Sequence, residues 1–429
     1  MSIGLRNMKK KLLQINVTAN WGSTGKIAEQ IGLMAMERGW ESYIAYGRMM
    51  NPSKSTLIKI GNQWDVYLHY AMSRFFDMEG LMSRRATRKL VQEINRIKPD
   101  VIHLHNIHDH YLNYPLLFEY LSKSKIPVVW TQHDMWAITG GCCYVPNDCK
   151  KWKKGCHKCE KRRGIWLDRS KKNFELKRRL FEPMKDLTIV TVSKWLGGEF
   201  KESFWGKGNI RVIHNGIDIN TFSPHEVDVH VRYGIVGKKI VLGVASEWSN
   251  RKGLDDFYRL AERLQRDEYV IMIVGKLLMD NVKVPENGCQ MIFIDRTQNS
   301  LELAQLYTEA AVFVNPTYQD NYPTTNLEAM ACGTPVITYK TGGSPEAVSD
   351  ETGYVVEQGN VAGLCEAVTM LSGKALAEEC RKRAELLFDG KRVYNEYVKL
   401  YARQTGGVIL AKGQSSCWGW LILGVSEKD

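Results

Sequence analysis

The sequence predicts an α/β protein made of two doubly wound, Rossmann-like domains that face each other across a cleft. The first observation is length, because 429 residues are too many for one ordinary core and two domains of roughly 200 residues are expected. The second is the alternation of short apolar runs with helical stretches in both halves, which is typical of parallel sheets covered by helices. The third is that no apolar run approaches the roughly 18–20 residues that span a bilayer.

The apolar runs are rich in valine and isoleucine and do not alternate strictly with polar residues, as expected for strands buried on both faces. In the first half, the predicted strands are Leu12–Val17, Tyr43–Tyr46, Val101–Leu104, Pro127–Thr131, Thr188–Val192 and Arg211–Ile213. In the second half, they are Ile240–Ala245, Val270–Val274, Met291–Ile294, Val312–Val314 and Val336–Thr338. The helical stretches between them include Lys26–Glu37, Arg85–Ile97, Leu254–Leu264 and Leu301–Glu309.

The domain boundary is predicted from turn residues in the middle of the chain. Asn215-Gly216-Ile217-Asp218 and the following Ser223-Pro224 separate an N-terminal domain over residues 9–222 from a C-terminal domain over 223–389. A helix over 390–405 is expected to pack back on the N-terminal domain, and residues 406–429 form a tail. Ligands of open α/β sheets bind at the carboxyl ends of the strands, so the cleft between the domains is the expected site.

The net charge of +12 is concentrated in one segment. From Lys150 to Arg179, 14 lysines and arginines stand against three acids, within an expected insert over residues 137–180. This density predicts a surface that faces an anionic partner, such as lipid headgroups or a lipid-linked phosphate. A solvated basic loop is the alternative interpretation, and nucleic acid is not expected as a partner. The first strand is interrupted by polar residues and does not read as a signal peptide, so a cytoplasmic location is expected.

The segment Asp320–Glu328, which reads Asp-Asn-Tyr-Pro-Thr-Thr-Asn-Leu-Glu, carries the strongest chemical signal. It follows a predicted strand and runs into a predicted helix over Leu327–Cys332, which ends at Gly333. Backbone N–H groups before such a helix can hold a diphosphate, and the two carboxylates can accept hydrogen bonds from sugar and ribose hydroxyls. Two surface acids near a helix start are the alternative interpretation.

Two further turns carry groups suited to phosphate. Arg251 and Lys252 follow the first strand of the C-terminal domain, where a lysine would neutralise a departing diphosphate. Gly22-Ser23-Thr24-Gly25-Lys26 resembles a Walker loop, but the glycines are too close together and Ile27 stands where Ser or Thr is required. We therefore expect a small-residue turn in which the backbone approaches a phosphate or sugar.

The block Glu328-Ala-Met-Ala-Cys-Gly-Thr-Pro-Val336 resembles the hallmark of retaining glycosyltransferases of the GT-B fold, specifically family four (glycosyl transferases group 1). The resemblance implies that Asp320 contacts the transferred sugar and that Glu328 binds the donor ribose. It also implies that His133, in Thr131-Gln132-His133-Asp134, borders that sugar. Asp320 departs from the glutamate of the family. Catalytic residues are thus expected at Asp320, Glu328, His133 and Lys252, and donor-binding residues at Gly22, Ser23, Gly25, Arg251, Lys252, Asn321, Tyr322, Thr324, Thr325 and Glu328.

The resemblance further implies an enzyme that moves a hexose from a nucleotide sugar to a glycan or lipid-linked acceptor with retention of anomeric configuration. The expected setting is bacterial surface polysaccharide, either capsule or lipopolysaccharide, at the cytoplasmic face of the inner membrane. No cofactor is required for catalysis in this scheme. A nucleotide-sugar 2-epimerase of the same fold is the first alternative, and a basic, zinc-stabilised nucleic-acid-binding protein is the second.

Five cysteines lie between residues 142 and 159, including the knuckle Cys156-His157-Lys158-Cys159. With Cys142 and Cys149, this knuckle supplies four thiolates, enough for a tetrahedral structural zinc. A subset of family four carries a similar Cys-rich insert, and that resemblance favours Cys142 over Cys143. Unliganded thiols are the alternative.

Overall fold

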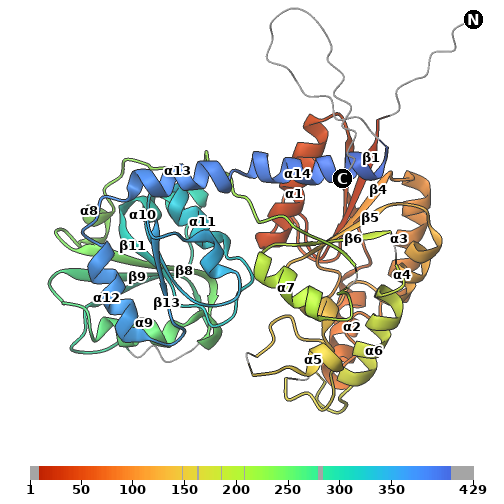
Figure 1. Cartoon of the computed structure of the whole chain (residues 1–429), viewed down its shortest axis with the longest axis horizontal. Helices are drawn as coiled ribbons and strands as arrows, with labels where there is room; N and C mark the ends of the chain where they lie inside the picture. The colour runs from red at the N-terminus through yellow and green to blue at the C-terminus, as the bar shows by residue number, and fades with distance from the viewer. Residues whose placement is uncertain are drawn as a thin grey trace, which may run out of the picture.

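The computed structural model describes residues 9–406, except for 147, 162–163, 185, 207 and 279–283. Two parallel sheets of seven and six strands, each packed with helices, form two lobes and confirm the predicted fold class (Figure 1). Nearly all of the predicted tail over 406–429 lies outside the described residues. Among those residues, the structure contains no helix with the length and apolar character that crossing a membrane requires.

The N-terminal sheet has the order β3-β2-β1-β4-β5-β6-β7. Its strands are β1 (Lys11–Asn16), β2 (Glu41–Tyr46), β3 (Thr56–Lys59), β4 (Val101–Leu104), β5 (Val128–Gln132), β6 (Leu187–Thr191) and β7 (Asn209–Val212). The helices of this lobe are α1 (Gly22–Glu37), α2 (Gln63–Phe76), α3 (Arg84–Ile97), α4 (Tyr114–Lys123), η1 (Trp136–Ile138), α5 (Lys151–Lys154), α6 (Ser170–Phe181) and α7 (Lys194–Glu202).

The C-terminal sheet has the equivalent order β10-β9-β8-β11-β12-β13. Its strands are β8 (Lys239–Trp248), β9 (Tyr269–Leu277), β10 (Gln290–Ile294), β11 (Ala310–Asn315), β12 (Val336–Tyr339) and β13 (Gly353–Val356). Its helices are α8 (Val229–Tyr233), η2 (Asn250–Lys252), α9 (Leu254–Ala261), α10 (Ser300–Glu309), α11 (Thr324–Ala331), η3 (Ser344–Ala347), α12 (Val361–Leu371) and α13 (Ala377–Leu387), and α14 (Gly390–Gln404) follows.

The strand order reverses at the first strand of each lobe, and this point decides where a ligand can sit. β1 pairs in parallel with both β2 and β4, and β8 pairs in parallel with both β9 and β11. Within each sheet, the connections on the two sides of the central strand therefore lie on opposite faces. This arrangement opens a crevice at the carboxyl ends of the strands. The turns after β1, β8 and β11 all lie at such crevices, and they carry most of the predicted site residues.

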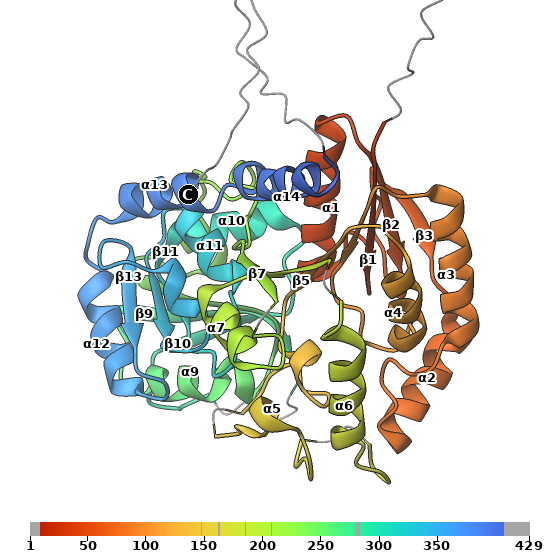
Figure 2. The same cartoon turned by 45° about the vertical axis from the view of Figure 1, so that its right-hand side comes forward.

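Helix α14 packs on the N-terminal lobe although it follows the C-terminal lobe in the chain (Figure 2). Tyr397 and Tyr401 are buried with Ile27 and Ile31 of α1 in one apolar cluster. The Tyr401 hydroxyl lies 2.6 Å from Nδ1 of buried His103 at the end of β4. The helix thus ties the chain end to the N-terminal sheet.

The chain crosses between the lobes twice, and the two crossings touch. Ile217 N donates to Phe388 O at 2.8 Å, and Gly390 N donates to Ile217 O at 2.8 Å. A Cβ on Gly216 would lie 2.8 Å from the Cα of Gly390, so the absence of a side chain permits this contact. Both connections therefore lie together at one edge of the interface between the lobes.

The structure differs from the predicted elements in several places. Helix α1 already begins at Gly22, so the predicted small-residue turn Gly22–Lys26 forms the start of that helix. The edge strands β3 and β13 were not predicted, because both are short and carry half-exposed residues. The helix predicted over Leu327–Cys332 begins earlier, at Thr324, directly after Pro323, and ends at Ala331. Pro323 has the extended backbone of a residue that precedes a helix, so Glu328 lies further inside the helix than predicted.

Helix α2 has an unusual distribution of side chains, because the residues that it buries are polar. The structure buries His69 and Ser73 on this helix and leaves aromatic residues exposed. The backbone N–H of Gly80 donates to Nε2 of His69 at 2.9 Å, so this nitrogen carries no proton. Burial, followed by the nearby charge of His110, lowers the pKa of His69 to about 3.

His69 should make the fold sensitive to acid. The unfolded chain binds a proton at His69 below a pH of roughly 6.5, whereas the folded chain does not until the pH approaches 3. The contribution of neutral His69 to the stability of the fold is therefore complete above the unfolded-state pKa of roughly 6.5, and it is lost as the pH falls from there toward 3. We expect urea denaturation to show a loss of about 1–2 kcal/mol from this residue between pH 7 and pH 5.

The matched variant is His69→Gln, whose amide oxygen can still accept from Gly80 N but does not titrate. Its stability should depend less steeply on pH over this range than that of the wild type. Parallel pH profiles for the two proteins would contradict the assignment.

Candidate active site between the two lobes

The turn after β8 is pressed against the loop after β11, and one glycine makes this possible. Gly253 has a φ of +77°, and a Cβ there would lie 2.1 Å from the carbonyl oxygen of Pro316. Only glycine tolerates both the left-handed backbone and the contact. As a result, Nζ of Lys252 lies 2.6 Å from Oδ2 of Asp320, and both side chains are largely buried.

Arg251 joins this turn to both lobes. Its Nη1 donates to Gln319 O at 2.8 Å, and its guanidinium carbon lies 4.4 Å from the centre of the Tyr144 ring. Tyr144 belongs to the N-terminal insert, and the neighbouring Val145 O accepts from Gln319 Nε2 at 3.2 Å. The insert therefore contacts the segment that contains Asp320.

His133 reaches the same segment from the N-terminal lobe. Its carbonyl oxygen accepts from Asn321 Nδ2 at 2.6 Å, and its Nε2 lies 3.1 Å from Nδ1 of His105. His105 in turn contacts Gln14 Oε1 at 3.0 Å. Burial is the main cause that lowers the pKa of His133 to about 4, so the ring is neutral at pH 7. A neutral imidazole can donate or accept a hydrogen bond from a sugar hydroxyl.

Glu328 lines a second region, a cavity of about 390 Å³ formed by both lobes. The N-terminal lobe contributes Gly22, Ser23 and Lys26, and the C-terminal lobe contributes Thr324 with Glu328. The Tyr307 hydroxyl donates to Oε2 of Glu328 at 3.2 Å. Burial raises the pKa of the Glu328 carboxyl, and the charge of Lys26 opposes this rise.

The predicted residues thus form two groups along the interface. Lys252, Asp320 and His133 meet in the first group, and neither Lys252 nor Asp320 lines the cavity of Glu328. The remaining predicted positions have other surroundings. Gly25 packs against Thr18 beneath α1, the carbonyl of Tyr322 accepts from Asn215 at 3.1 Å, and Thr325 lies half-buried in the first turn of α11.

Lys26 is a candidate that the sequence interpretation missed. In the sequence, Lys26 stands out only as part of a Walker-like loop, and the spacing of that loop does not match the Walker pattern. In the structure, Lys26 lies in the first turns of α1 and lines the cavity with Glu328 from the opposite lobe. The available signal was a lysine directly after a glycine turn at the end of a predicted strand.

Glu346 forms several hydrogen bonds between the lobes. It lies on η3 of the C-terminal lobe and accepts from the backbone N–H groups of Lys194 and Trp195 at 2.8 and 2.7 Å. Those groups begin α7 of the N-terminal lobe, where the helix dipole favours a carboxylate. Nε2 of His214 lies 3.0 Å from Oε2 of Glu346, and these hydrogen bonds lower the pKa of the Glu346 carboxyl.

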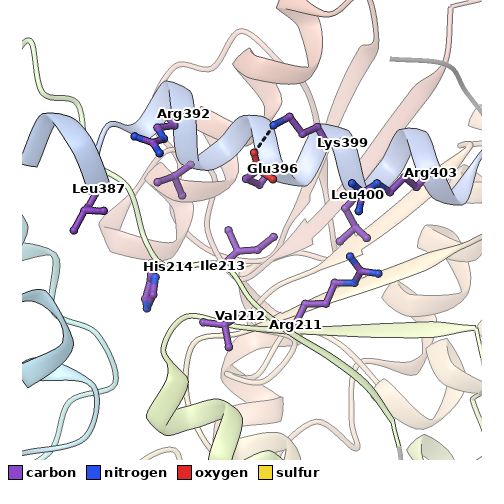
Figure 3. A pocket seen from close by; sticks show the side chains of 11 residues that line it. Arg211, Val212, Ile213, His214, Leu387, Arg392, Glu396, Lys399, Leu400 and Arg403 are labelled. Carbon is purple, nitrogen blue, oxygen red and sulfur yellow. Dashed lines mark hydrogen bonds and ion pairs between the residues drawn. The ribbon is translucent and has the colours of Figure 1, made fainter. Parts of the chain in front are cut away.

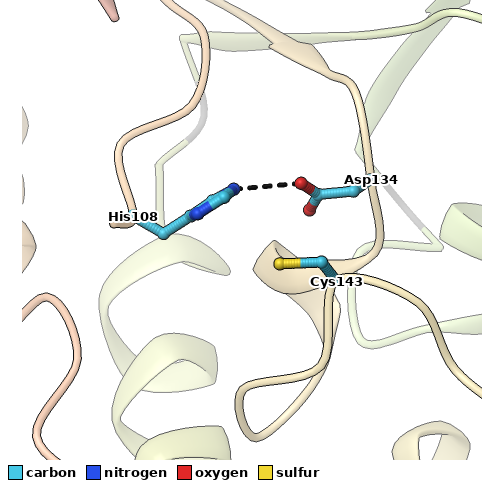
Figure 4. A group of neighbouring side chains, drawn as sticks. All are labelled: His108, Asp134 and Cys143. Carbon is cyan, nitrogen blue, oxygen red and sulfur yellow. Dashed lines mark hydrogen bonds and ion pairs between the residues drawn. The ribbon is translucent and has the colours of Figure 1, made fainter. Parts of the chain in front are cut away.

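The predicted zinc ligands approach one another only in part. The thiol of Cys142 is hydrogen-bonded to Cys159, which raises the pKa of Cys142, and Gly140 N donates to Sγ of Cys156 at 3.2 Å. Cys149 lines a neighbouring cavity. Within the described part of the chain, the single group of three metal-binding side chains with ligand atoms inside 4.8 Å is His108, Asp134 and Cys143 (Figure 4). The four-cysteine zinc site stays a prediction.

A cavity of about 570 Å³, larger than the cavity of Glu328, lies elsewhere, between β7 and α14 (Figure 3). Arg211, Arg392 and Arg403 line it, together with an ion pair of Lys399 and Glu396 at 2.6 Å. It contains none of the predicted site residues, so size alone does not locate the site.

The two Rossmann-like lobes have the arrangement of the GT-B fold, which the chain shares with the solved glycosyltransferase WaaG at a TM-score of 0.61. The family model described as Glycosyltransferase Family 4 matches residues 35–221, and the model described as Glycosyl transferases group 1 matches residues 238–373. The chain therefore belongs to glycosyltransferase family 4, group 1. Membership in the subset with a Cys-rich insert stays a prediction.

Known proteins resemble the chain over nearly its whole length. A relative from Escherichia coli (strain K12), the glycosyl transferase WcaC, is named for colanic acid biosynthesis and is 26% identical over 91% of this chain and 99% of its own. Sucrose-phosphate synthase from Thermosynechococcus elongatus shares the fold with a TM-score of 0.68 and 15% identity, over 93% of this chain and all of its own. Anabaena HepE in complex with UDP gives a TM-score of 0.64 and 15% identity, over 92% of this chain and all of its own.

Glu346→Ala should loosen the contact between the lobes. The change removes a charged acceptor of two backbone N–H groups, which weakens the closed arrangement by about 1.5–3 kcal/mol. Small-angle scattering should therefore show a larger radius of gyration than the wild type at pH 7. Because the pKa of Glu346 is lowered, the wild type should keep the full contact above a pH of about 4.5 and lose it only as the pH falls through the lowered pKa.

The control is Glu357→Ala, which removes an exposed carboxylate that pairs with Lys340 on the same lobe. This variant should scatter like the wild type. An unchanged radius for Glu346→Ala would show that other contacts hold the lobes together.

Proposed function

We propose that the protein transfers a hexose from a nucleotide sugar to a glycan or lipid-linked acceptor, with retention of anomeric configuration, in bacterial surface polysaccharide biosynthesis. The observation that carries this proposal is the 2.6 Å contact between Lys252 and Asp320 at the crevice of the C-terminal sheet. A cation and a carboxylate in one largely buried site match the two needs of the reaction, which are a stabilised diphosphate and an oriented sugar.

The two groups of site residues correspond to the two ends of such a donor. Glu328, in the cavity that both lobes line, would accept hydrogen bonds from the ribose hydroxyls. Lys252 would stabilise the diphosphate, and Asp320 with His133 would hold the sugar. Lys26 and the backbone at Gly22 and Ser23 would approach the donor from the other lobe. In this arrangement, the donor itself links the lobes.

The reaction would proceed by front-face attack, the scheme that the resemblance to family four implies. In this scheme Asp320 orients the sugar and does not attack it. The bond between the sugar carbon and the diphosphate breaks as the acceptor oxygen binds the same face. The acceptor proton passes to the departing diphosphate, whose negative charge Lys252 stabilises. No cofactor takes part in this scheme.

The similar proteins support a nucleotide sugar as the donor and a surface polysaccharide as the product. HepE is described in complex with UDP, and WcaC is named for colanic acid biosynthesis, a bacterial surface polysaccharide. By extension, we assign a nucleotide sugar as donor and a growing polysaccharide or its lipid carrier as acceptor. The basic segment Lys150–Arg179 would then face the anionic surface of the inner membrane from the cytoplasm.

The Cys-rich insert would shape the acceptor side of the site. Tyr144 and Val145 contact Arg251 and Gln319, so the insert already touches the donor-binding loops. A zinc held by Cys142, Cys149, Cys156 and Cys159 would be structural, because four thiolates leave no open position. Normal turnover of acceptor after deletion of the insert would contradict this role.

Donor binding should raise the melting temperature, because a ligand that binds only the folded state stabilises it. We expect one or more of a panel of nucleotide sugars to stabilise the wild type, by about 2.7 kcal/mol at one hundred times the dissociation constant. Glu328→Ala and Lys252→Ala should abolish this response without lowering the melting temperature of the free protein by more than a few degrees.

Two exposed residues of the same lobe serve as controls. Glu357→Ala and Lys382→Ala remove comparable charges from exposed ion pairs and should keep the full response. If the two site variants respond like the wild type, the donor-site assignment is wrong.

A further inference from the structure

The exposed face of α2 is apolar, which is the reverse of an ordinary surface helix. Trp64, Tyr67, Leu68 and Phe75 follow one another at helical spacing and are exposed, with 80% of Trp64 accessible. The buried side of the same helix carries His69 and Ser73. A helix that folds only to cover a core turns its apolar stripe inward, so this stripe is suited to a partner outside the chain.

A second exposed apolar segment continues this face. Ile165, Trp166 and Leu167 are exposed, and 63% of Trp166 is accessible. Their backbone is tied to the end of α2, because Ile165 N donates to Arg74 O at 2.8 Å and Trp166 N donates to Phe75 O at 3.0 Å. The rings of Phe75 and Trp166 stack with centres 4.6 Å apart. We call the exposed apolar residues of α2 and of 165–167 the aromatic face.

The lysines and arginines near the aromatic face indicate the class of partner that this face is suited to bind. Residues 165–167 lie inside the basic segment Lys150–Arg179, between Lys161-Arg162-Arg163 and Arg169-Ser170-Lys171-Lys172. Lys161, Lys171 and Lys172 are exposed. Tryptophan and tyrosine prefer the boundary between hydrocarbon and headgroups, and lysine and arginine bind anionic headgroups beside it.

We propose that the aromatic face is a membrane-docking surface that inserts its tryptophans into the headgroup region of an anionic bilayer. A bilayer fits better than a protein partner, because an exposed apolar helix stripe combined with exposed lysines is the pattern of interfacial helices. The shallow insertion needs no spanning helix. The biological role of this membrane contact rests on the lipid-linked acceptor proposed above. The contact itself can be measured without any transfer reaction.

The test is sedimentation of the full-length protein with vesicles. The wild type should bind vesicles of phosphatidylethanolamine with about one third phosphatidylglycerol, and should bind neutral phosphatidylcholine vesicles far less. Raising the salt to about 0.5 M should weaken binding, because it screens the headgroup charge. Emission from the exposed tryptophans should shift to shorter wavelength on binding.

The variant Trp64→Ser/Leu68→Ser/Trp166→Ser should lower the affinity for anionic vesicles by about tenfold or more, since it removes the largest inserted side chains. The matched control Val236→Ser/Leu301→Ser changes two exposed apolar residues of the C-terminal lobe and should bind like the wild type. Both variants should keep the wild-type melting temperature.

Three results would overturn the proposal. The wild type could fail to bind anionic vesicles, or the triple variant could bind them as tightly as the wild type. Alternatively, the wild type could self-associate in a way that the triple variant abolishes, without binding vesicles, which would assign the face to a second copy. Loss of the donor response with vesicle binding intact would contradict only the proposed function, and the reverse result would contradict only the docking surface.

Discussion

A lysine and a carboxylate in contact at the inner face of the C-terminal lobe set the geometry of the candidate site. The contact between Lys252 and Asp320 joins the turns after β8 and β11, and Gly253 allows these turns to meet. Because each charge neutralises the other, the site can exist without a bound anion at low electrostatic cost. An arriving diphosphate would compete with Asp320 for the lysine, which would leave a carboxylate oxygen available to a sugar hydroxyl. The same pair can therefore stabilise the free enzyme and orient the donor.

The sequence predicts the fold, because buried parallel strands are rich in valine and isoleucine. It also predicts where the loops of the site lie, because these loops follow the ends of the strands. The exceptions have physical reasons. β3 and β13 lie at sheet edges, where half-exposed residues replace the apolar run, and so no signal of burial exists. Helix α11 begins at Thr324, directly after Pro323, because a proline lacks the N–H that the helix interior requires but fits at a helix start. Helical periodicity, in turn, could not show that the apolar stripe of α2 faces solvent, since the pattern is the same for a stripe facing the core.

Contacts between the lobes were the part of the site that the sequence could not supply. Lys26 and Glu328 are about 300 positions apart, yet they line one cavity, and no local pattern links them. The same holds for Glu346, whose carboxylate caps the start of α7, and for Asn321, which donates to the carbonyl of His133. Each of these contacts depends on how two folded lobes meet. Motifs predicted the donor-side residues one by one, and only the structure separated the predicted residues into two groups.

The insert over residues 137–180 contacts both the aromatic face and the candidate active site, and so it can link the two. Its first part, at Tyr144 and Val145, touches the loop of Asp320, while its later part, at residues 165–167, is bonded to the end of α2. If the aromatic face lies on a bilayer, a lipid-linked acceptor diffusing in that bilayer meets the enzyme beside the insert. The search for acceptor then takes place in two dimensions, and the insert spans the distance from headgroup to donor. A rigid insert would serve this purpose better than a mobile loop, and this is the advantage that the proposed structural zinc would give.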